Sequence, residues 1–205
     1  MDYLNSSLSS FTKALASPSA VPGGGGASAL AGALGAALGD MVGELTVGKQ
    51  KYADREVELL GLMARAQALR SRLLRCVQKD AAAFAPLARA YTIPKDDPTR
   101  TAVMERCLRD AASVPLEIME LCAESIEVLR RFADLGSPIV LSDAAAGAAL
   151  CRGAIQGAAV NVYVNTRLMQ DRDRADALNR RADELLERSL PLADQIYEDV
   201  HQKLL

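Results

Sequence analysis

The sequence predicts an all-α protein, a bundle of long helices that occupies residues 1–205 as one domain. Long segments repeat apolar residues with the period of the α-helix, whereas the period-2 alternation typical of strands is missing. Aromatic residues make up only 4% of the chain, and β-branched residues are sparse. Half of the residues are hydrophobic, so a chain of 205 residues can bury a core without disulfides or a structural metal.

The first two predicted helices are separated by a glycine-rich loop. Residues 2–15 carry apolar side chains on one helical face, and residues 17–26, with two prolines and four consecutive glycines, predict a loop. A second helix is expected from Ala27 to about Thr46, ended by Gly48. Each glycine inside it costs about 1 kcal/mol relative to alanine, so close packing of another backbone is expected along their shared face. These glycines are Gly32, Gly35, Gly39 and Gly43.

Four further helices follow, each bounded by a proline, a glycine or a capping residue. They are expected at about residues 53–90, 98–135, 142–169 and 172–204. Pro115 is expected to kink the second of these four. The helix that begins after Ser142 is dense in alanine and glycine, so we expect it to pack against the glycine face of the helix from Ala27. Such a tight core is compatible with either a monomer or a dimer.

Charge and composition exclude several classes of function. The net charge is −2 and the pI is about 5.5, which argues against a nucleic-acid partner and against binding to an anionic membrane. The stretch 26–47 is apolar, but Asp40 and Glu44 make it a poor membrane span, and we expect a buried helix there. Residues 1–13 lack the features of a signal peptide. A cytoplasmic location is expected.

The metal-ligating residue types are also arranged unfavourably for a metal site. The chain has one histidine, His201, and four cysteines that are too far apart in sequence for a zinc knuckle or a redox pair. Each cysteine has apolar neighbours, which is typical of reduced, buried thiols in a cytosolic protein. We therefore expect no metal and no redox centre.

Two motifs contain candidate anion-binding groups. Gly23, Gly24, Gly25 and Gly26 precede a predicted helix, and their N–H groups could approach a carboxylate, a phosphate or a developing negative charge. A flexible turn before a helix is the alternative, and the signatures of a P-loop or a dinucleotide fingerprint are missing. Lys49 and Lys51 follow the next helix. They could bind an anion or take part in catalysis, or could simply stabilise the negative end of the helix.

Two aspartates and two asparagines are candidates for catalysis and binding. Asp80 lies in an apolar helical stretch, where desolvation would raise its pKa and suit it to acid–base catalysis, unless Lys79 or Lys49 pairs with it. Asp143 lies at the start of a predicted helix. Either the positive end of the helix dipole favours an acidic residue there, or Asp143 is a second catalytic carboxyl group. Asn161 and Asn165 share one face of that helix among valines, and could bind a ligand or another helix.

In order along the chain, these motifs resemble those of a known family. The resemblance rests on the Gly-rich loop and helix at 22–38, the lysine motif at 45–52, the Asp80 block, the block at 141–144 and Asn-Val-Tyr-Val-Asn at 161–165. It covers essentially the whole chain. The family contains formiminotetrahydrofolate cyclodeaminases and bacterial methenyltetrahydrofolate cyclohydrolases. Gln50 departs from the lysine expected in many relatives, which weakens any role for a charge at that position.

The resemblance implies a function as well as a fold. It implies an all-helical homodimer that acts on a tetrahydrofolate substrate, with no cofactor besides that substrate. The chain has no room for the formiminotransferase domain of bifunctional members, so hydrolysis of 5,10-methenyltetrahydrofolate to 10-formyltetrahydrofolate is expected. Asp80 is expected to be the base, with Asp143 as a second candidate and Lys49 in support. The glycines, Lys51 and the two asparagines would bind substrate. A cyclodeaminase that releases ammonia and a non-catalytic helical assembly protein are the alternatives.

Overall fold

The computed structural model describes residues 2–204, and this range contains six α-helices, two 3-10 turns and no strand. The all-α prediction is confirmed. The helices are α1 (Leu8–Leu15), α2 (Gly24–Glu44), α3 (Glu56–Ala90), α4 (Arg100–Leu135), α5 (Leu141–Thr166) and α6 (Arg172–Leu204), and the 3-10 turns are η1 (Gln50–Arg55) and η2 (Pro138–Val140).

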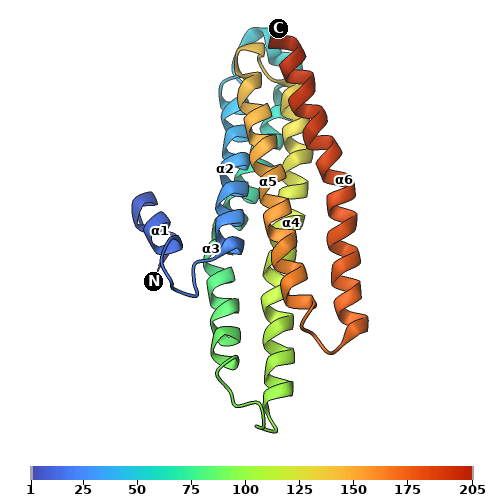
Figure 1. Ribbon diagram of the computed structural model, residues 1–205. Coiled ribbons are helices and arrows are strands. Elements are labelled where there is room, and N and C mark those ends of the chain that lie inside the picture. The colour runs from blue at the N-terminus through green and yellow to red at the C-terminus, as the bar shows by residue number, and fades with distance from the viewer. Residues whose placement is uncertain (1, 205) are drawn as a thin grey trace.

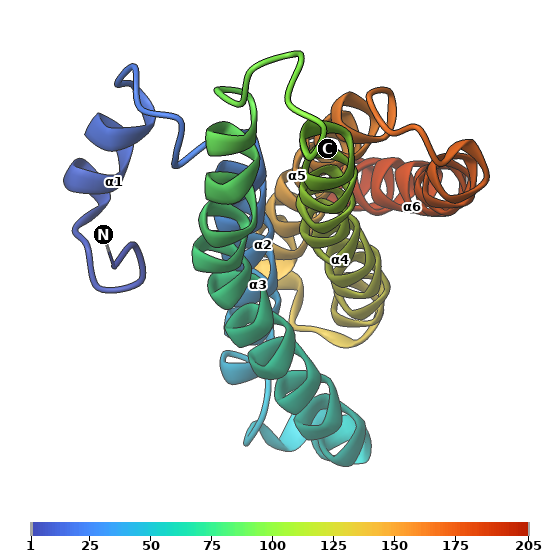
Figure 2. The ribbon, with the colours of Figure 1, turned by 90° about the horizontal axis from the view of Figure 1, so that it is seen from below.

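Four long helices form a closed ring around the core (Figures 1 and 2). Helix α2 packs against α3 and α5, and α4 packs against the same two helices on the other side. Helix α6 covers α4 and α5, and α1 lies apart at the side of the bundle, where its Phe11 is buried. The largest fully buried side chains include Leu73, Ile118, Met119, Leu129, Phe132 and Ile155. The core therefore fills the space inside the ring.

The predicted close packing of α2 on α5 is confirmed at Gly35 and Gly147. A Cβ atom built on Gly35 would lie 2.7 Å from the carbonyl oxygen of Gly147, and one built on Gly147 would lie 2.9 Å from the oxygen of Gly35. Real Cβ atoms do not approach backbone this closely, so both positions require glycine. The lost helix propensity is thus offset by the close approach of two helix backbones.

Several helix ends differ from the sequence predictions. Helix α1 begins at Leu8 rather than Asp2, because Ser7 caps it by accepting a hydrogen bond from the Ser10 N–H at 3.1 Å. Helix α3 begins at Glu56, after the 3-10 turn η1. Helix α5 begins at Leu141 and ends at Thr166, so Ser142 lies in its first turn and is not the N-cap. Helix α4 begins at Arg100, whereas the bounds of α6 match the prediction.

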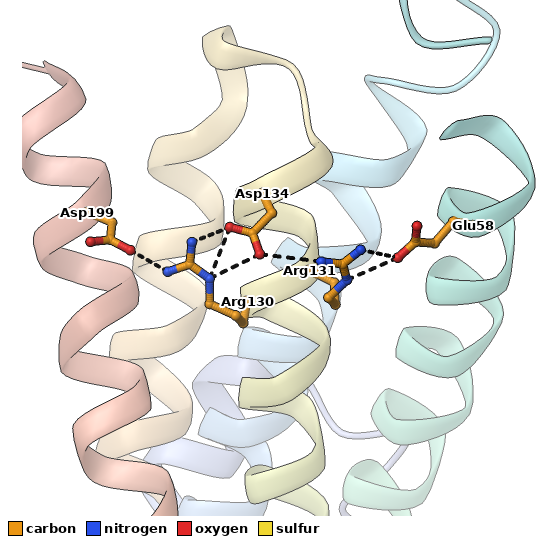
Figure 3. A network of polar contacts seen from close by, with 5 residues as sticks. All are labelled: Glu58, Arg130, Arg131, Asp134 and Asp199. Atoms are coloured by element: carbon orange, nitrogen blue, oxygen red, sulfur yellow. Dashed lines mark hydrogen bonds and ion pairs between the residues drawn. The ribbon is translucent and has the colours of Figure 1, made fainter. Parts of the chain in front are cut away.

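A network of ion pairs joins α3, α4 and α6 near the C-terminal end of α4 (Figure 3). Arg130 bonds to Asp134 one turn along α4 and to Asp199 of α6, while Arg131 bonds to Glu58 of α3 and to Asp134. Its members are partly exposed, so the network sets the relative positions of the helices more than it stabilises them.

Two helical stretches are long and apolar enough to cross a membrane, by length and composition alone. They are Gly24–Glu44 and Pro138–Thr166, and 61% and 50% of their most apolar windows are buried inside the protein. Because α2 and α5 pack against each other in the ring of helices, burial in the bundle accounts for the apolar residues on their inner faces.

Candidate functional site

The N-terminus of α2 lies against the Asp80 side chain of α3. The N–H of Gly26 donates a hydrogen bond to Asp80 Oδ2 at 2.9 Å. A Cβ atom on Gly25 would collide with the same carboxyl group, 2.6 Å from Cγ and 2.8 Å from Oδ2. The positive end of the α2 dipole therefore faces an acidic side chain, and the Gly26 N–H, which has no acceptor within the helix, bonds to it. This arrangement stabilises a carboxylate.

This contact corrects the predicted start of α2. The expected loop ran to Gly26, but Gly24, Gly25 and Gly26 form the first turn of α2, with Gly23 as its N-cap. An interior glycine normally disfavours a helix, yet here the turn is paired with Asp80, and a larger residue at Gly25 would displace the Asp80 carboxyl group. Gly25 therefore serves close approach to Asp80, whereas Gly24 faces Asn161.

Asp80 is partly buried and has no cation beside it among the described residues. Burial raises the pKa of the Asp80 carboxyl above its ordinary value, and the hydrogen bond from Gly26 opposes this rise. Lys79 extends away to Glu117, with an Nζ–Oε1 distance of 3.0 Å, and Lys49 Nζ donates to the carbonyl of Leu45. Within one chain, neither lysine therefore forms the ion pair with Asp80 that was the alternative interpretation.

Asp80 lines a pocket of about 340 Å³ between α2, α3, α4 and α5. Its walls are apolar around a few polar groups, as is typical of sites for small organic ligands. The lining comprises Ala20, Val21, Gly23, Gly24, Gly25, Asp80, Phe84, Tyr91, Ala111, Pro115, Asn161, Val164 and Asn165.

The two predicted asparagines supply the amide groups of this pocket. Asn161 Nδ2 donates to the carbonyl of Gly157 at 2.8 Å, and a Cβ atom on Gly24 would lie 3.1 Å from the same nitrogen. Asn165 Nδ2 donates to the carbonyls of Ala111 and Asn161, at 3.2 and 2.8 Å. The pocket thus combines a carboxyl group that can exchange a proton with fixed amide groups that can orient a polar ring.

The remaining predicted site residues lie at the opposite end of the bundle. Asp143 is in the first turn of α5, 18 residues before Asn161, which places the two roughly 27 Å apart along the helix. Lys49 and Lys51 follow the far end of α2. Within one chain, Asp143, Lys49 and Lys51 therefore do not join Asp80, so the predicted site is divided between two ends.

A larger pocket, of about 460 Å³, lies at that opposite end and includes Lys51, Arg55 and Lys203. The carboxylate that lines it, Asp134, is already held by Arg130 and Arg131. This pocket therefore lacks an acidic group that is free to accept a proton, and the smaller pocket at Asp80 is better suited to acid–base chemistry.

Seven residues that line the Asp80 pocket were not predicted as site residues: Ala20, Val21, Phe84, Tyr91, Ala111, Pro115 and Val164. Tyr91 follows α3, Pro115 interrupts α4, and Val164 lies between the two asparagines. Pro115 carried a signal, since a proline inside a helix leaves one carbonyl without its partner. Tyr91 carried none, because only the fold brings the end of α3 to α5. No group of three metal-ligating side chains occurs within residues 2–204.

Fold and site together define a class of protein: an all-α bundle with an acidic, amide-lined pocket at a glycine-rich helix end. The sequence model of the formiminotransferase-cyclodeaminase family matches residues 7–184. The chain belongs to this family.

Individual relatives span both kinds of enzyme in the family. The methenyltetrahydrofolate cyclohydrolase of Methylorubrum extorquens is 35% identical over 204 residues, 98% of each chain. The formimidoyltransferase-cyclodeaminase of Rattus norvegicus is 32% identical over 82% of this chain, which spans 32% of that longer protein. The crystal structure of formiminotetrahydrofolate cyclodeaminase from Thermotoga maritima superposes with a TM-score of 0.83, at 27% identity, over 98% of this chain and 96% of that one.

Proposed function

We propose that this chain hydrolyses 5,10-methenyltetrahydrofolate to 10-formyltetrahydrofolate. The observation that carries the proposal is the Asp80 carboxyl group, which lines the pocket with one oxygen held by Gly26 and the other, Oδ1, without a hydrogen-bond partner among the described residues. The likeness to the Methylorubrum extorquens cyclohydrolase over 98% of both chains supports the same reaction.

The reaction needs a base beside a cationic carbon. The substrate carbon that bridges N5 and N10 is amidinium-like and attracts a carboxylate. Water adds to this carbon while Asp80 Oδ1 takes one of its protons, and the tetrahedral adduct then loses its bond to N5. Asp80 returns the proton to N5, and the second proton of the water is released as the adduct becomes the neutral 10-formyl group. General acid–base catalysis of this kind contributes about 10²- to 10⁴-fold in rate.

The physical state of Asp80 suits this role. Burial raises the pKa of the Asp80 carboxyl, so it exchanges a proton closer to neutral pH than a solvated aspartate does. The hydrogen bond from Gly26 keeps the group oriented and retains part of its acidity. Asn161 and Asn165 would bind the pterin ring, and the N-terminal end of α2 would contact the substrate through the N-cap Gly23 and through Gly24.

The second candidate function is formiminotetrahydrofolate cyclodeamination, which the match to the Thermotoga maritima structure favours. There N10 attacks the formimino carbon and ammonia leaves, and the same acidic group would serve. One experiment separates the two: the purified protein is given each folate, and loss of the methenyl absorbance and release of ammonia are followed. We expect methenyl hydrolysis well above the spontaneous rate. Ammonia release without comparable methenyl hydrolysis would decide for the cyclodeaminase.

A non-catalytic assembly protein, the third alternative, predicts no folate binding by calorimetry and no effect of changing Asp80. The relatives that match this chain are named as enzymes, which favours catalysis. We further propose that the protein is cytoplasmic and uses no cofactor or metal besides its folate substrate. Nucleic acid and membrane are not among its proposed partners, because the chain is slightly acidic.

We also propose a homodimer formed through the outer faces of α2 and α5. Leu34, Met41, Val160 and Val164 are 49%, 46%, 64% and 52% exposed on these neighbouring helices. Gly153 of α5 is exposed, and a Cβ atom there would meet nothing within 4 Å, so no neighbour within the chain explains this glycine. An antiparallel second copy would cover the face and would place Lys49, Lys51 and Asp143 of one subunit near the Asp80 pocket of the other.

A further inference from the structure

Pro115 and Asn165 form a pair across the wall of the Asp80 pocket. Proline has no N–H, so Pro115 leaves the carbonyl of Ala111, four residues earlier in α4, without its helical hydrogen bond. Ala111 is 4% exposed, and a buried carbonyl without a partner is costly. Asn165 of α5 replaces the missing donor, because its Nδ2 lies 3.2 Å from that oxygen.

This pairing fixes the orientation of the Asn165 amide. Its second amide hydrogen is used by the carbonyl of Asn161, at 2.8 Å. Both partners are carbonyl oxygens, which only accept, so Nδ2 must face them and cannot exchange places with Oδ1. Asn165 is 6% exposed and lines the pocket, which leaves Oδ1 as its one unused polar atom. Asn165 therefore offers the pocket an acceptor and no donor.

The position of Asn165 along α5 places its Oδ1 acceptor near the amino-bearing end of a bound pterin ring. Asn161 contacts the first turn of α2 beside Asp80, and Asn165 lies one turn, roughly 6 Å, further along α5. In a pterin the 2-amino group is at the end of the bicycle remote from N5. A ring whose bridging carbon is at Asp80 would therefore direct its amino group toward Asn165.

We infer that Asn165 Oδ1, held in place by the carbonyl that Pro115 frees, accepts a hydrogen bond from the 2-amino group of the pterin and selects for it. Asn165 is a specificity-determining residue and Pro115 is a positioning residue that acts through it. The inference rests on the proposed folate substrate and goes beyond it, because it states which ligand atom this side chain recognises.

Ligand selectivity tests the recognition step. Calorimetry compares tetrahydrofolate with its 2-desamino-2-methyl analogue, for the wild type and for Asn165→Leu. We expect the wild type to prefer the amino compound roughly tenfold, as one hydrogen bond to a buried acceptor predicts, and Asn165→Leu to bind both compounds alike. Asn165→Leu should also raise KM far more than it lowers kcat. A preference retained by Asn165→Leu would overturn the inference.

Thermal unfolding tests the pairing without any ligand. Asn165→Leu leaves the Ala111 carbonyl unpaired and should lower the melting temperature, and adding Pro115→Ala should restore much of the loss by supplying a backbone N–H. Pro191→Ala is the matched control, since Pro191 interrupts α6 at an exposed position away from the pocket. Equal effects of both proline changes in the Asn165→Leu background would refute the pairing.

The two levels of failure are distinguishable. If the wild type binds neither tetrahydrofolate nor its 2-desamino-2-methyl analogue, the proposed function fails and the inference fails with it. If the wild type binds and hydrolyses folate but shows no preference for the amino compound, the inference alone fails. Should Asn165→Leu not fold, the selectivity is measured on Asn165→Leu combined with Pro115→Ala, where the carbonyl again has a donor.

Discussion

Replacing Gly25 with alanine tests whether the glycine-rich turn serves the contact between α2 and Asp80. The added Cβ would lie 2.6 Å from Asp80 Cγ and 2.8 Å from Oδ2, too close for the carboxyl group to remain where it is. Asp80 would have to rotate away, and the N–H of Gly26 would lose the acceptor that now lies 2.9 Å from it. The change thus displaces the proposed base without altering its chemistry.

The expected cost in stability is small. A hydrogen bond to a charged group contributes about 1.5–3 kcal/mol, whereas alanine gains about 1 kcal/mol over glycine in a helix. The free energy of unfolding should therefore fall by only about 0.5–2 kcal/mol, and the fold should persist. The rate of methenyl hydrolysis, in contrast, should fall by about 10²- to 10⁴-fold, because the general base is misplaced.

The assay combines urea unfolding with the loss of methenyl absorbance. Gly61→Ala is the matched control, since Gly61 is exposed in the second turn of α3 and a Cβ atom there meets nothing within 4 Å. The control should gain up to about 1 kcal/mol in the free energy of unfolding and keep its full activity. If Gly25→Ala retained activity equal to that of Gly61→Ala, the contact between α2 and Asp80 would have no catalytic role.

Three further predictions follow from burial and packing. Burial raises the pKa of the Asp80 carboxyl, so the folded protein binds this proton more tightly than the unfolded chain does. Its contribution to the free energy of unfolding is present at low pH and is lost as the pH rises through the folded-state pKa. Asp80→Asn should therefore unfold at higher urea concentration than the wild type at pH 7, and this advantage should shrink below the ordinary aspartate range. Equal urea midpoints for Asp80→Asn and the wild type at pH 7 would show that burial of Asp80 does not destabilise the fold. Burial also raises the pKa of the Cys76 thiol to about 11 and that of Cys151 to about 12, so a thiol reagent at pH 8 should leave both unmodified until urea is added. Rapid labelling of either in the native protein would show that the core opens. Finally, Gly153→Ala should weaken dimerisation in analytical ultracentrifugation, because it adds a Cβ atom on the proposed interface, whereas Gly61→Ala should not. An unchanged dissociation constant for Gly153→Ala would show that the dimer forms through another surface.

The sequence predicted the helices well because apolar periodicity and the residues that begin or end a helix are local properties of the chain. The bounds of α6 and the packing of α2 on α5 followed from apolar spacing and from a stripe of glycines. The start of α2 did not, because four glycines read locally as a loop. Only the Asp80 side chain, 54 residues away in sequence, gives the glycine turn its partner.

The candidate site was predicted in composition but not in arrangement. Asp80, Asn161 and Asn165 were identified as polar residues on apolar helical faces, and they line one pocket. The sequence could not show that Asp80 lies at the end of the bundle that holds Asn161 rather than at the end that holds Asp143 and Lys49, because that depends on how the helices pack. Nor could it relate Pro115 to Asn165, since that contact depends on how α4 and α5 pack.

Hydrolysis of 5,10-methenyltetrahydrofolate by the wild type and by Asp80→Asn tests the central claim most directly. Both proteins are first shown to have the same circular dichroism, and the decay of methenyl absorbance is then compared with the spontaneous rate. Catalysis by the wild type and a loss of about 10²- to 10⁴-fold in Asp80→Asn are predicted. Nearly normal turnover by Asp80→Asn would contradict the account, because the pocket would then owe its chemistry to another group.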